Sequence, residues 1–138
     1  SLHGGVESMQ IVILGGSGRF GQWYAGLLVR AGHAVTITGR NRTKLEAAAR
    51  AVGAEWATDN TPASTAYVVI VAASLPSVGR LIDDTVRVAR PGTLVCDLAS
   101  VKGEAAAAYA RVTRDDLELA SLHPLHGPRT PRLPCRGD

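Results

Sequence analysis

The feature that most constrains the fold is a glycine-rich turn between an apolar run and an amphipathic segment. Residues 11–14 form the apolar run Ile-Val-Ile-Leu, and Gly-Gly-Ser-Gly-Arg-Phe-Gly follows at positions 15–21. From Arg19 to Ala31, apolar residues recur at helical spacing, and Gly32 then provides a stop signal. A buried strand that passes through such a turn directly into a helix is typical of dinucleotide-binding domains.

Each glycine of this turn has a distinct expected purpose. Glycine allows a tight backbone turn at Gly16, close approach of a pyrophosphate at Gly18, and close packing of helix against strand at Gly21. The first helical turn presents free N–H groups and the positive end of the helix dipole to that pyrophosphate. The alternative is a glycine-rich turn without a ligand. We predict cofactor contacts from the whole turn, namely Gly16, Ser17, Gly18, Arg19, Phe20 and Gly21.

The rest of the chain alternates β-branched runs with helical patterns, as a parallel sheet covered on both faces requires. After residues 11–14, strands are predicted at 34–38, 55–58, 67–72, 93–97 and 117–122. Further helices are predicted from a Thr43 cap to Gly53, between Pro76 and Ala89, and from about Glu104 to Arg111. Right-handed crossovers then favour an α/β doubly wound Rossmann fold, mainly parallel, with the strand order 3-2-1-4-5-6.

Length and composition indicate one domain with a small anionic ligand. The chain has 138 residues, 46% of them hydrophobic, and carries a net charge of +3. Its arginines are scattered and its apolar runs are short, so we expect neither nucleic acid nor a membrane as a partner. Two distant cysteines are compatible with a reducing cytoplasm. We expect residues 1–8 to be a leader or an expression remnant, 9–123 the dinucleotide-binding domain, and 124–138 an exit linker.

The segment after the second predicted strand favours NADP over NAD. An NAD site commonly places an acidic residue there to bind the ribose hydroxyls, but the sequence Thr-Gly-Arg-Asn-Arg-Thr at positions 38–43 has none. The guanidinium groups of Arg40 and Arg42 and the amide of Asn41 instead suit a 2′-phosphate. A solvated loop is the alternative, and NAD stays open because some NAD sites also lack the acid. Ala73 and Ser74, after the strand of residues 67–72, complete the predicted cofactor contacts.

A second constellation follows the fifth and sixth predicted strands. The first segment reads Asp-Leu-Ala-Ser-Val-Lys at positions 97–102, and the second reads His-Pro-Leu-His-Gly at positions 123–127. Both lie at the carboxyl edge of the predicted sheet, where ligands bind in this architecture. Together with the glycine turn, these segments resemble the prephenate and arogenate dehydrogenases of tyrosine biosynthesis, whose motifs are GGxGxxG, D-x-x-S-V-K and H-P-M-F-G.

The resemblance covers about residues 9–131 and implies roles for three residues. His123 is implied to be the catalytic histidine that hydrogen-bonds the substrate hydroxyl, with Ser100 orienting it and Lys102 contributing to an anionic-substrate pocket. Leu125 and His126 depart from the family's Met and Phe. The resemblance also implies a dimerising C-terminal helical domain, which we expect to be absent from this chain, so that the fragment alone catalyses poorly.

The resemblance therefore implies an NADP-dependent prephenate or arogenate dehydrogenase of the cytoplasm, here as its nucleotide-binding domain. Its small-molecule partner would be anionic prephenate or arogenate, and the full-length protein would be a homodimer. One alternative is another NADP oxidoreductase, such as a deazaflavin-dependent NADP reductase, although the Ser100-Val101-Lys102 and His123-Pro124 pairings argue against it. A second alternative is a non-catalytic nucleotide-binding module. No metal ligand set is predicted.

Overall fold

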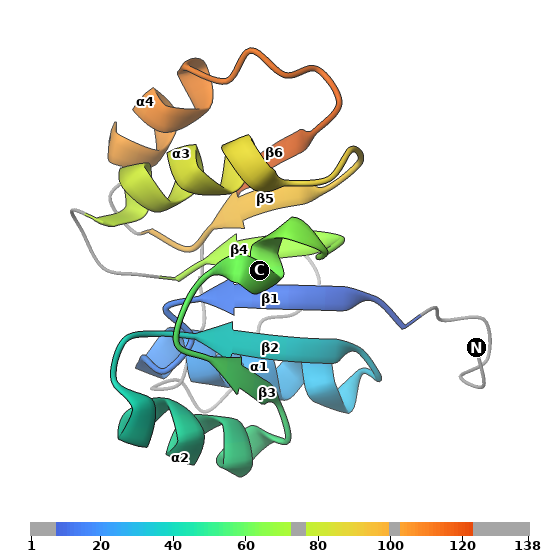
Figure 1. The fold of residues 1–138 in the computed structure, drawn as a ribbon, viewed down its shortest axis with the longest axis vertical. Coiled ribbons are helices and arrows are strands. Elements are labelled where there is room, and N and C mark those ends of the chain that lie inside the picture. The colour runs from blue at the N-terminus through green and yellow to red at the C-terminus, as the bar shows by residue number, and fades with distance from the viewer. Residues whose placement is uncertain (1–7, 73–76, 100–102, 123–138) are drawn as a thin grey trace.

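The computed structural model describes residues 8–72, 77–99 and 103–122, and within them one parallel sheet is covered by helices (Figure 1). The strand order is β3-β2-β1-β4-β5-β6, as the sequence predicts, and every neighbouring pair is parallel. The elements in chain order are β1 (Gln10–Leu14), α1 (Arg19–Arg30), β2 (Ala34–Thr38), α2 (Arg42–Val52), β3 (Glu55–Ala57), the 3-10 helix η1 (Thr61–Ser64), β4 (Val68–Val71), α3 (Ser77–Val88), β5 (Leu94–Asp97), α4 (Gly103–Ala110) and β6 (Glu118–Ser121).

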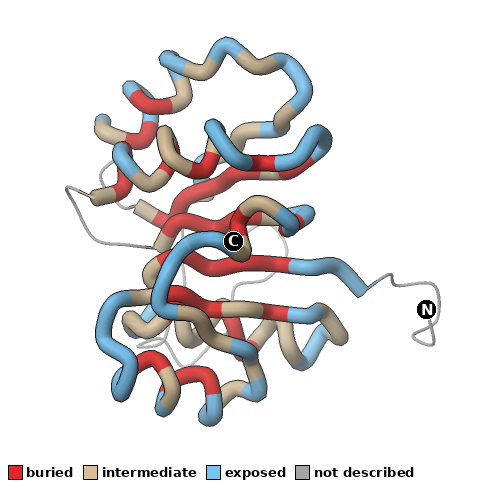
Figure 2. The backbone as a smooth tube through the Cα atoms, viewed as in Figure 1, coloured by how far each residue is buried: buried red, intermediate tan, exposed pale blue. Residues whose placement is uncertain are grey.

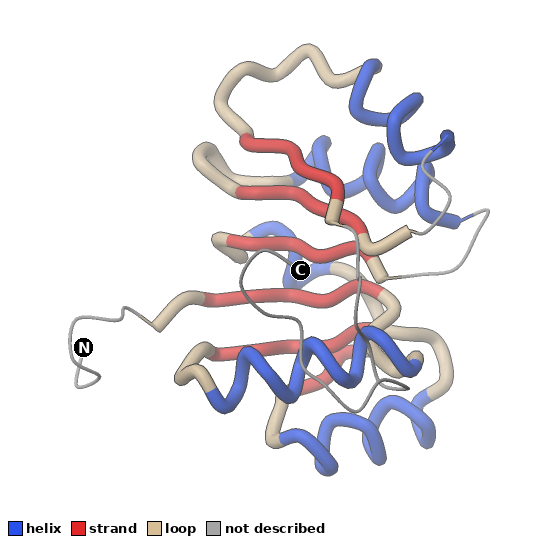
Figure 3. Tube along the Cα trace, turned by 180° about the vertical axis from the view of Figure 1, so that it is seen from behind, coloured by secondary structure: helices blue, strands red, loops and turns tan. Residues whose placement is uncertain are grey.

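The core consists of two clusters, one on each face of the sheet. Side chains alternate between faces along a strand, so Ile11 and Ile13 of β1 join the cluster under α1 and α2, while Val12 and Leu14 join the cluster under α3 and α4. The central strands are accordingly buried on both sides (Figure 2). Seen from behind, α1 lies over one face of the sheet (Figure 3).

The start of α2 corrects one prediction. The sequence suggested Thr43 as the helix cap, but Asn41 has that position, and its Oδ1 accepts a hydrogen bond from the Lys44 N–H at 3.0 Å. The chain enters the helix two residues earlier because Asn41 adopts the extended backbone of a cap. The predicted end at Gly53 is confirmed, since this glycine is left-handed with φ of 81°.

The strand order reverses between β1 and β4. The strands that follow β1 in the chain, β2 and β3, lie on one side of it, and those that follow β4, β5 and β6, lie on the other side. In open α/β sheets, the crevice at such a switch point, beyond the carboxyl ends of the strands, receives the ligand. The glycine turn follows β1 directly, so the fold places it at this crevice. The described ranges contain no helix with the length and apolar character needed to cross a membrane.

Candidate functional site

The glycine turn is held against the end of β2 by two backbone hydrogen bonds. The N–H groups of Gly15 and Gly16 both donate to the Thr38 carbonyl oxygen, at 2.9 and 3.0 Å. The left-handed residue is Gly15, with φ of 78°. The tight turn predicted at Gly16 therefore occurs one residue earlier, because the backbone must turn before it can reach Thr38.

The other glycines differ in what a side chain would meet. A Cβ on Gly16 would lie 2.7 Å from the Ile37 Cβ, and one on Gly21 would lie 2.7 Å from the Gly16 Cα. Both positions therefore exclude side chains for reasons of packing. A Cβ on Gly18 would meet only the Gly15 carbonyl oxygen, at 3.7 Å. Gly18 faces open space, which fits the predicted approach path of a pyrophosphate.

The N-terminus of α1 is open toward the same space. Gly18 is its N-cap and provides no side-chain hydrogen bond, and the first turn of the helix has no acidic residue. The first N–H groups of a helix have no carbonyl partner within it, and the helix dipole adds partial positive charge there. The turn therefore has the donors and the space for an anion, and it fits the pyrophosphate of a dinucleotide.

A cavity of about 510 Å³ extends from this turn between β2, β3 and α3. Ligand pockets are commonly about 300–1,000 Å³, so its size suits a nucleotide. At its edge the buried Thr38 hydroxyl donates to the Asn60 Oδ1 at 2.7 Å. The cavity is lined by Leu14, Gly15, Ser17, Gly18, Thr38, Gly39, Arg40, Lys44, Thr58, Asn60, Ala72, Ser77, Arg80 and Leu81.

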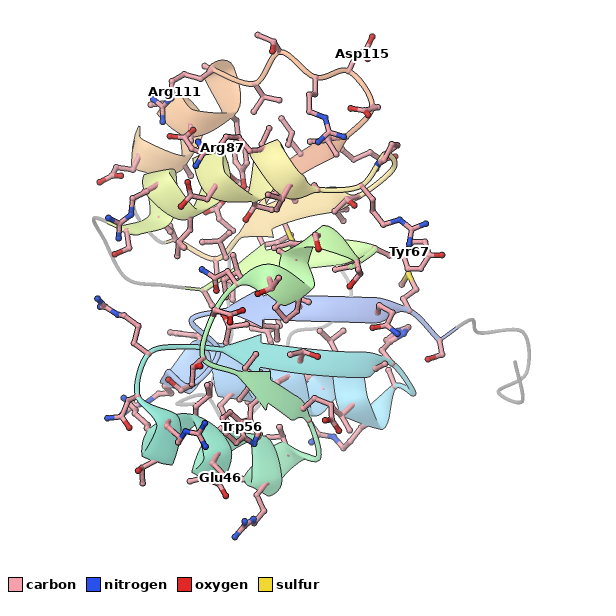
Figure 4. The ribbon with its side chains drawn as sticks, in the orientation of Figure 1. Glu46, Trp56, Tyr67, Arg87, Arg111 and Asp115 are labelled. Atoms are coloured by element: carbon pink, nitrogen blue, oxygen red, sulfur yellow. The ribbon has the colours of Figure 1, made fainter. Side chains whose placement is uncertain are left out.

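Of the two arginines predicted to bind the 2′-phosphate, Arg40 lines the cavity and Arg42 does not. The Arg42 guanidinium carbon lies 5.1 Å from the centre of the Trp56 ring, in a cation–π contact between α2 and β3. Trp56 projects from β3 beside α2 (Figure 4). Lys44 lines the cavity instead. Lys44 lies in the first turn of α2, three residues after its Asn41 cap, and the basic character of this segment is the signal that could have identified it.

Arg80 is a second cation that sequence reasoning missed. It comes from α3 and lines the same cavity as Arg40, which follows β2. No local motif marks it, because its place depends on how α3 crosses the sheet. Thr58 and Asn60 were also missed, since they follow the short strand β3.

The remaining predicted cofactor contacts are distributed unevenly. Ser17 lines the cavity, Asn41 caps α2, and Phe20 is exposed. Arg19 lines a separate hollow with Trp23 and Arg30 of α1 and Val52 of α2. Ala73 and Ser74 lie outside the described residues.

The three residues of the second constellation, Ser100, Lys102 and His123, also lie outside the described residues. The strands that precede them are described: β5 and β6 are parallel neighbours, with Asp97 paired to Ser121. Where the chain is described, no group of three or more His, Cys, Asp or Glu side chains is arranged to hold a metal ion.

Asp97, at the end of β5, is a fully buried carboxyl group that joins three elements. Its Oδ1 accepts hydrogen bonds from the hydroxyls of Tyr109 on α4, at 2.8 Å, and Ser121 on β6, at 2.7 Å. Its Oδ2 accepts from the Ala99 N–H at 3.0 Å. Burial, and then the hydrogen bond to Asp97, raise the pKa of Tyr109, so its hydroxyl keeps its proton. The network fixes the ends of β5 and β6 relative to each other.

Replacing Tyr109 with Phe tests this network. The variant removes a donor to a buried carboxyl group, so we expect the free energy of unfolding to fall by about 1–3 kcal/mol. Tyr67→Phe is the matched control, because Tyr67 is exposed and its ring lies under Arg90. Urea denaturation of both variants measures the difference. Equal and small changes in the two would contradict a structural role for the Tyr109 hydroxyl.

Comparison with known proteins aligns residues 24–132 with a family model described as prephenate dehydrogenase, nucleotide-binding domain. A curated relative from Methanocaldococcus jannaschii, a probable arogenate/prephenate dehydrogenase, is 30% identical over 127 residues. That alignment covers 91% of this chain and 28% of the relative.

Two solved structures share the fold. Prephenate dehydrogenase from A. aeolicus, in complex with hydroxyphenyl propionate and NAD+, matches with a TM-score of 0.74 and 17% identity, over 88% of this chain and 43% of that one. Synechocystis arogenate dehydrogenase matches with a TM-score of 0.65 and 23% identity, over 74% of this chain and 38% of that one. At these identities the likeness shows the fold alone, and the chain spans less than half the length of each of these proteins.

Proposed function

The chain belongs to the prephenate dehydrogenase family through its nucleotide-binding domain, and from that membership we propose that the intact protein is an NADP-dependent prephenate or arogenate dehydrogenase. The observation that carries this proposal is the open anion cradle at Gly18 inside a domain of this family. Turnover of prephenate and arogenate by the intact protein, followed through absorbance of the reduced nicotinamide, is the direct test. Absence of turnover with both substrates and both cofactors would overturn it.

The proposed cofactor lies along the cavity with its pyrophosphate at the glycine turn. Backbone N–H groups at the start of α1 bind the pyrophosphate, and Gly18 leaves the path to them open. Arg40 and Lys44, both lining the cavity, bind the 2′-phosphate of NADP. Asn41 fixes the backbone at Lys44 through its cap on α2, and Arg42 contributes positive charge from its contact with Trp56.

The proposed chemistry is an oxidative decarboxylation. When bound, the nicotinamide supplies the acceptor for hydride from the substrate's carbinol carbon. His123 takes the hydroxyl proton. An imidazole can do this at neutral pH because its unperturbed pKa is about 6.5. Ser100 holds the imidazole in one orientation, and Lys102 binds a substrate carboxylate by charge. Loss of carbon dioxide then makes the ring aromatic.

The proposed domain division and assembly of the intact protein are based on its family. We propose that residues 9–123 form the cofactor domain and residues 124–138 an exit linker toward a region that completes the substrate site. The coverage of only 28% to 43% of the relatives is consistent with that division. The intact protein is proposed to be a cytoplasmic homodimer, assembled through that further region.

Cofactor preference is tested at Arg40. We expect the wild-type chain to bind NADP more tightly than NAD, and Arg40→Ala to remove most of the difference, because a charge-assisted pair to phosphate is worth about 1.5–3 kcal/mol, or about tenfold or more in Kd. Calorimetric titration with both dinucleotides measures it. Arg50→Ala is the control, since Arg50 lies on α2 and pairs with Glu46. A wild-type chain that binds the two equally, or prefers NAD, would show the proposed preference to be wrong.

A further inference from the structure

The described cations fall into two groups, those with partners and those without. Salt bridges join Arg50 to Glu46, Arg87 to Asp84, Arg111 to Asp83 and Arg114 to Asp116. Arg42 and Arg90 lie over the rings of Trp56 and Tyr67. These pairs are distributed over the surface from α2 to α4, and Figure 4 labels several of their members.

Three cations without an ion pair among the described residues share one cavity. They are Arg40 and Lys44 on the side of α2, and Arg80 on the side of α3. Five described cations in all have no salt bridge or ring contact, and the other two, Arg19 and Arg30, line a different hollow. The cavity therefore concentrates positive charge that the described part of the chain does not neutralise.

Arg80 is free for a ligand because its nearest acidic neighbours on α3 are engaged elsewhere. Asp83 and Asp84 lie three and four residues further along, where a helix normally brings side chains together. However, the Asp83 carboxylate binds Arg111 at 2.9 Å, and the Asp84 carboxylate binds Arg87. Asp59 accepts hydrogen bonds from Thr61 and lines a neighbouring cavity rather than this one.

The charge at the cavity exceeds what a pyrophosphate requires. The backbone of the glycine turn and the dipole of α1 already serve that group. Three further full positive charges, from the segment after β2 and from α3, suit a ligand with an additional phosphate, whose charge at neutral pH is about −1.5 to −2.

We propose that Arg80 is a specificity-determining residue that binds the 2′-phosphate of NADP from α3, together with Arg40 and Lys44 from the segment after β2. This inference rests on the proposed function, because it assumes that the cavity binds a dinucleotide. It adds a determinant outside the loop in which cofactor choice was predicted. Discrimination between NADP and NAD then depends on Arg80 of α3 as well as on Arg40 and Lys44.

The experiment is calorimetric titration of the full chain and its variants with NADP and with NAD. Arg80→Ala should weaken NADP binding by about fivefold, the upper range for an exposed charge pair, and NAD binding by less than about twofold. Arg80→Lys should retain most of the NADP affinity, because it keeps the charge. Arg90→Ala, just after the same helix, should change neither affinity, because Arg90 lies over the Tyr67 ring and does not line the cavity. The NADP affinity of Arg80→Ala should also depend less on salt.

Circular dichroism and thermal melting of each variant establish that the fold is kept, which we expect because Arg80 is exposed on its helix. Equal weakening of NADP and NAD by Arg80→Ala would overturn the inference, and so would unchanged NADP affinity. A wild-type chain that binds neither dinucleotide would overturn the proposed function and this inference with it. Failure confined to the Arg80 variants would overturn this inference alone.

Discussion

A Gly18→Val variant is expected to lose measurable binding of both NADP and NAD while keeping the wild-type fold. The added side chain would project into the open space in front of the turn, since a Cβ there meets only one protein atom within 4 Å, the Gly15 carbonyl oxygen at 3.7 Å. The backbone of Gly18, with φ of −76° and ψ of 172°, is a conformation that valine adopts without strain. The branched side chain would therefore block the pyrophosphate rather than disturb the core.

Two further glycine variants separate loss of binding from loss of folding. Gly16→Val should unfold the chain or severely destabilise it, because its Cβ would lie 2.7 Å from the Ile37 Cβ in the core. Gly103→Val, at the start of α4, meets nothing within 4 Å and should leave binding intact. Circular dichroism and calorimetric titration distinguish these outcomes. A folded Gly18→Val variant with wild-type affinity would show that this turn is not the phosphate site.

Much of the fold could be predicted because its signals are local and mutually consistent. The buried runs that became β1 and β4 have no polar face, which indicates a sheet covered on both sides. Gly32 and Gly53, both with positive φ, follow α1 and α2 as predicted. Once the strands alternate with helices, the handedness of crossovers leaves few strand orders, and the observed one is among them.

The site was predicted less completely because side-chain direction depends on tertiary contacts. Arg40 and Arg42 are equivalent in sequence, yet Arg42 lies over Trp56 because β3 pairs with β2 and brings that ring beside α2. The left-handed residue of the turn is Gly15 rather than Gly16, because the turn must reach the Thr38 carbonyl. Arg80 on α3 lines the same cavity as the glycine turn, and Tyr109 on α4 contacts Asp97 on β5. Both arrangements bring together residues far apart in the sequence, and no local pattern marks either of them.

From the role proposed for His123, we expect His123→Asn in the intact protein to preserve cofactor affinity and to lower kcat by about two to four orders of magnitude, the usual contribution of a positioned general base. β6 is the last described strand before His123 in the sequence. The Leu122 N–H donates to the Asp97 carbonyl oxygen at 2.9 Å, and the Ser121 hydroxyl donates to the Asp97 carboxyl group at 2.7 Å. In the sequence, His123 comes directly after these two anchored residues and directly before Pro124.

Steady-state kinetics with prephenate or arogenate, together with cofactor titration, test this role. Ser100→Ala should cause a smaller loss of kcat, because the role proposed for the serine is to orient the imidazole and not to take the proton. His126→Asn is the matched control, a second histidine three residues along the same segment for which no role is proposed. Near-normal turnover of His123→Asn with a large loss in His126→Asn would assign the base to the other histidine. Normal turnover of both variants would mean that neither imidazole takes the proton, and the proposed chemistry would be wrong.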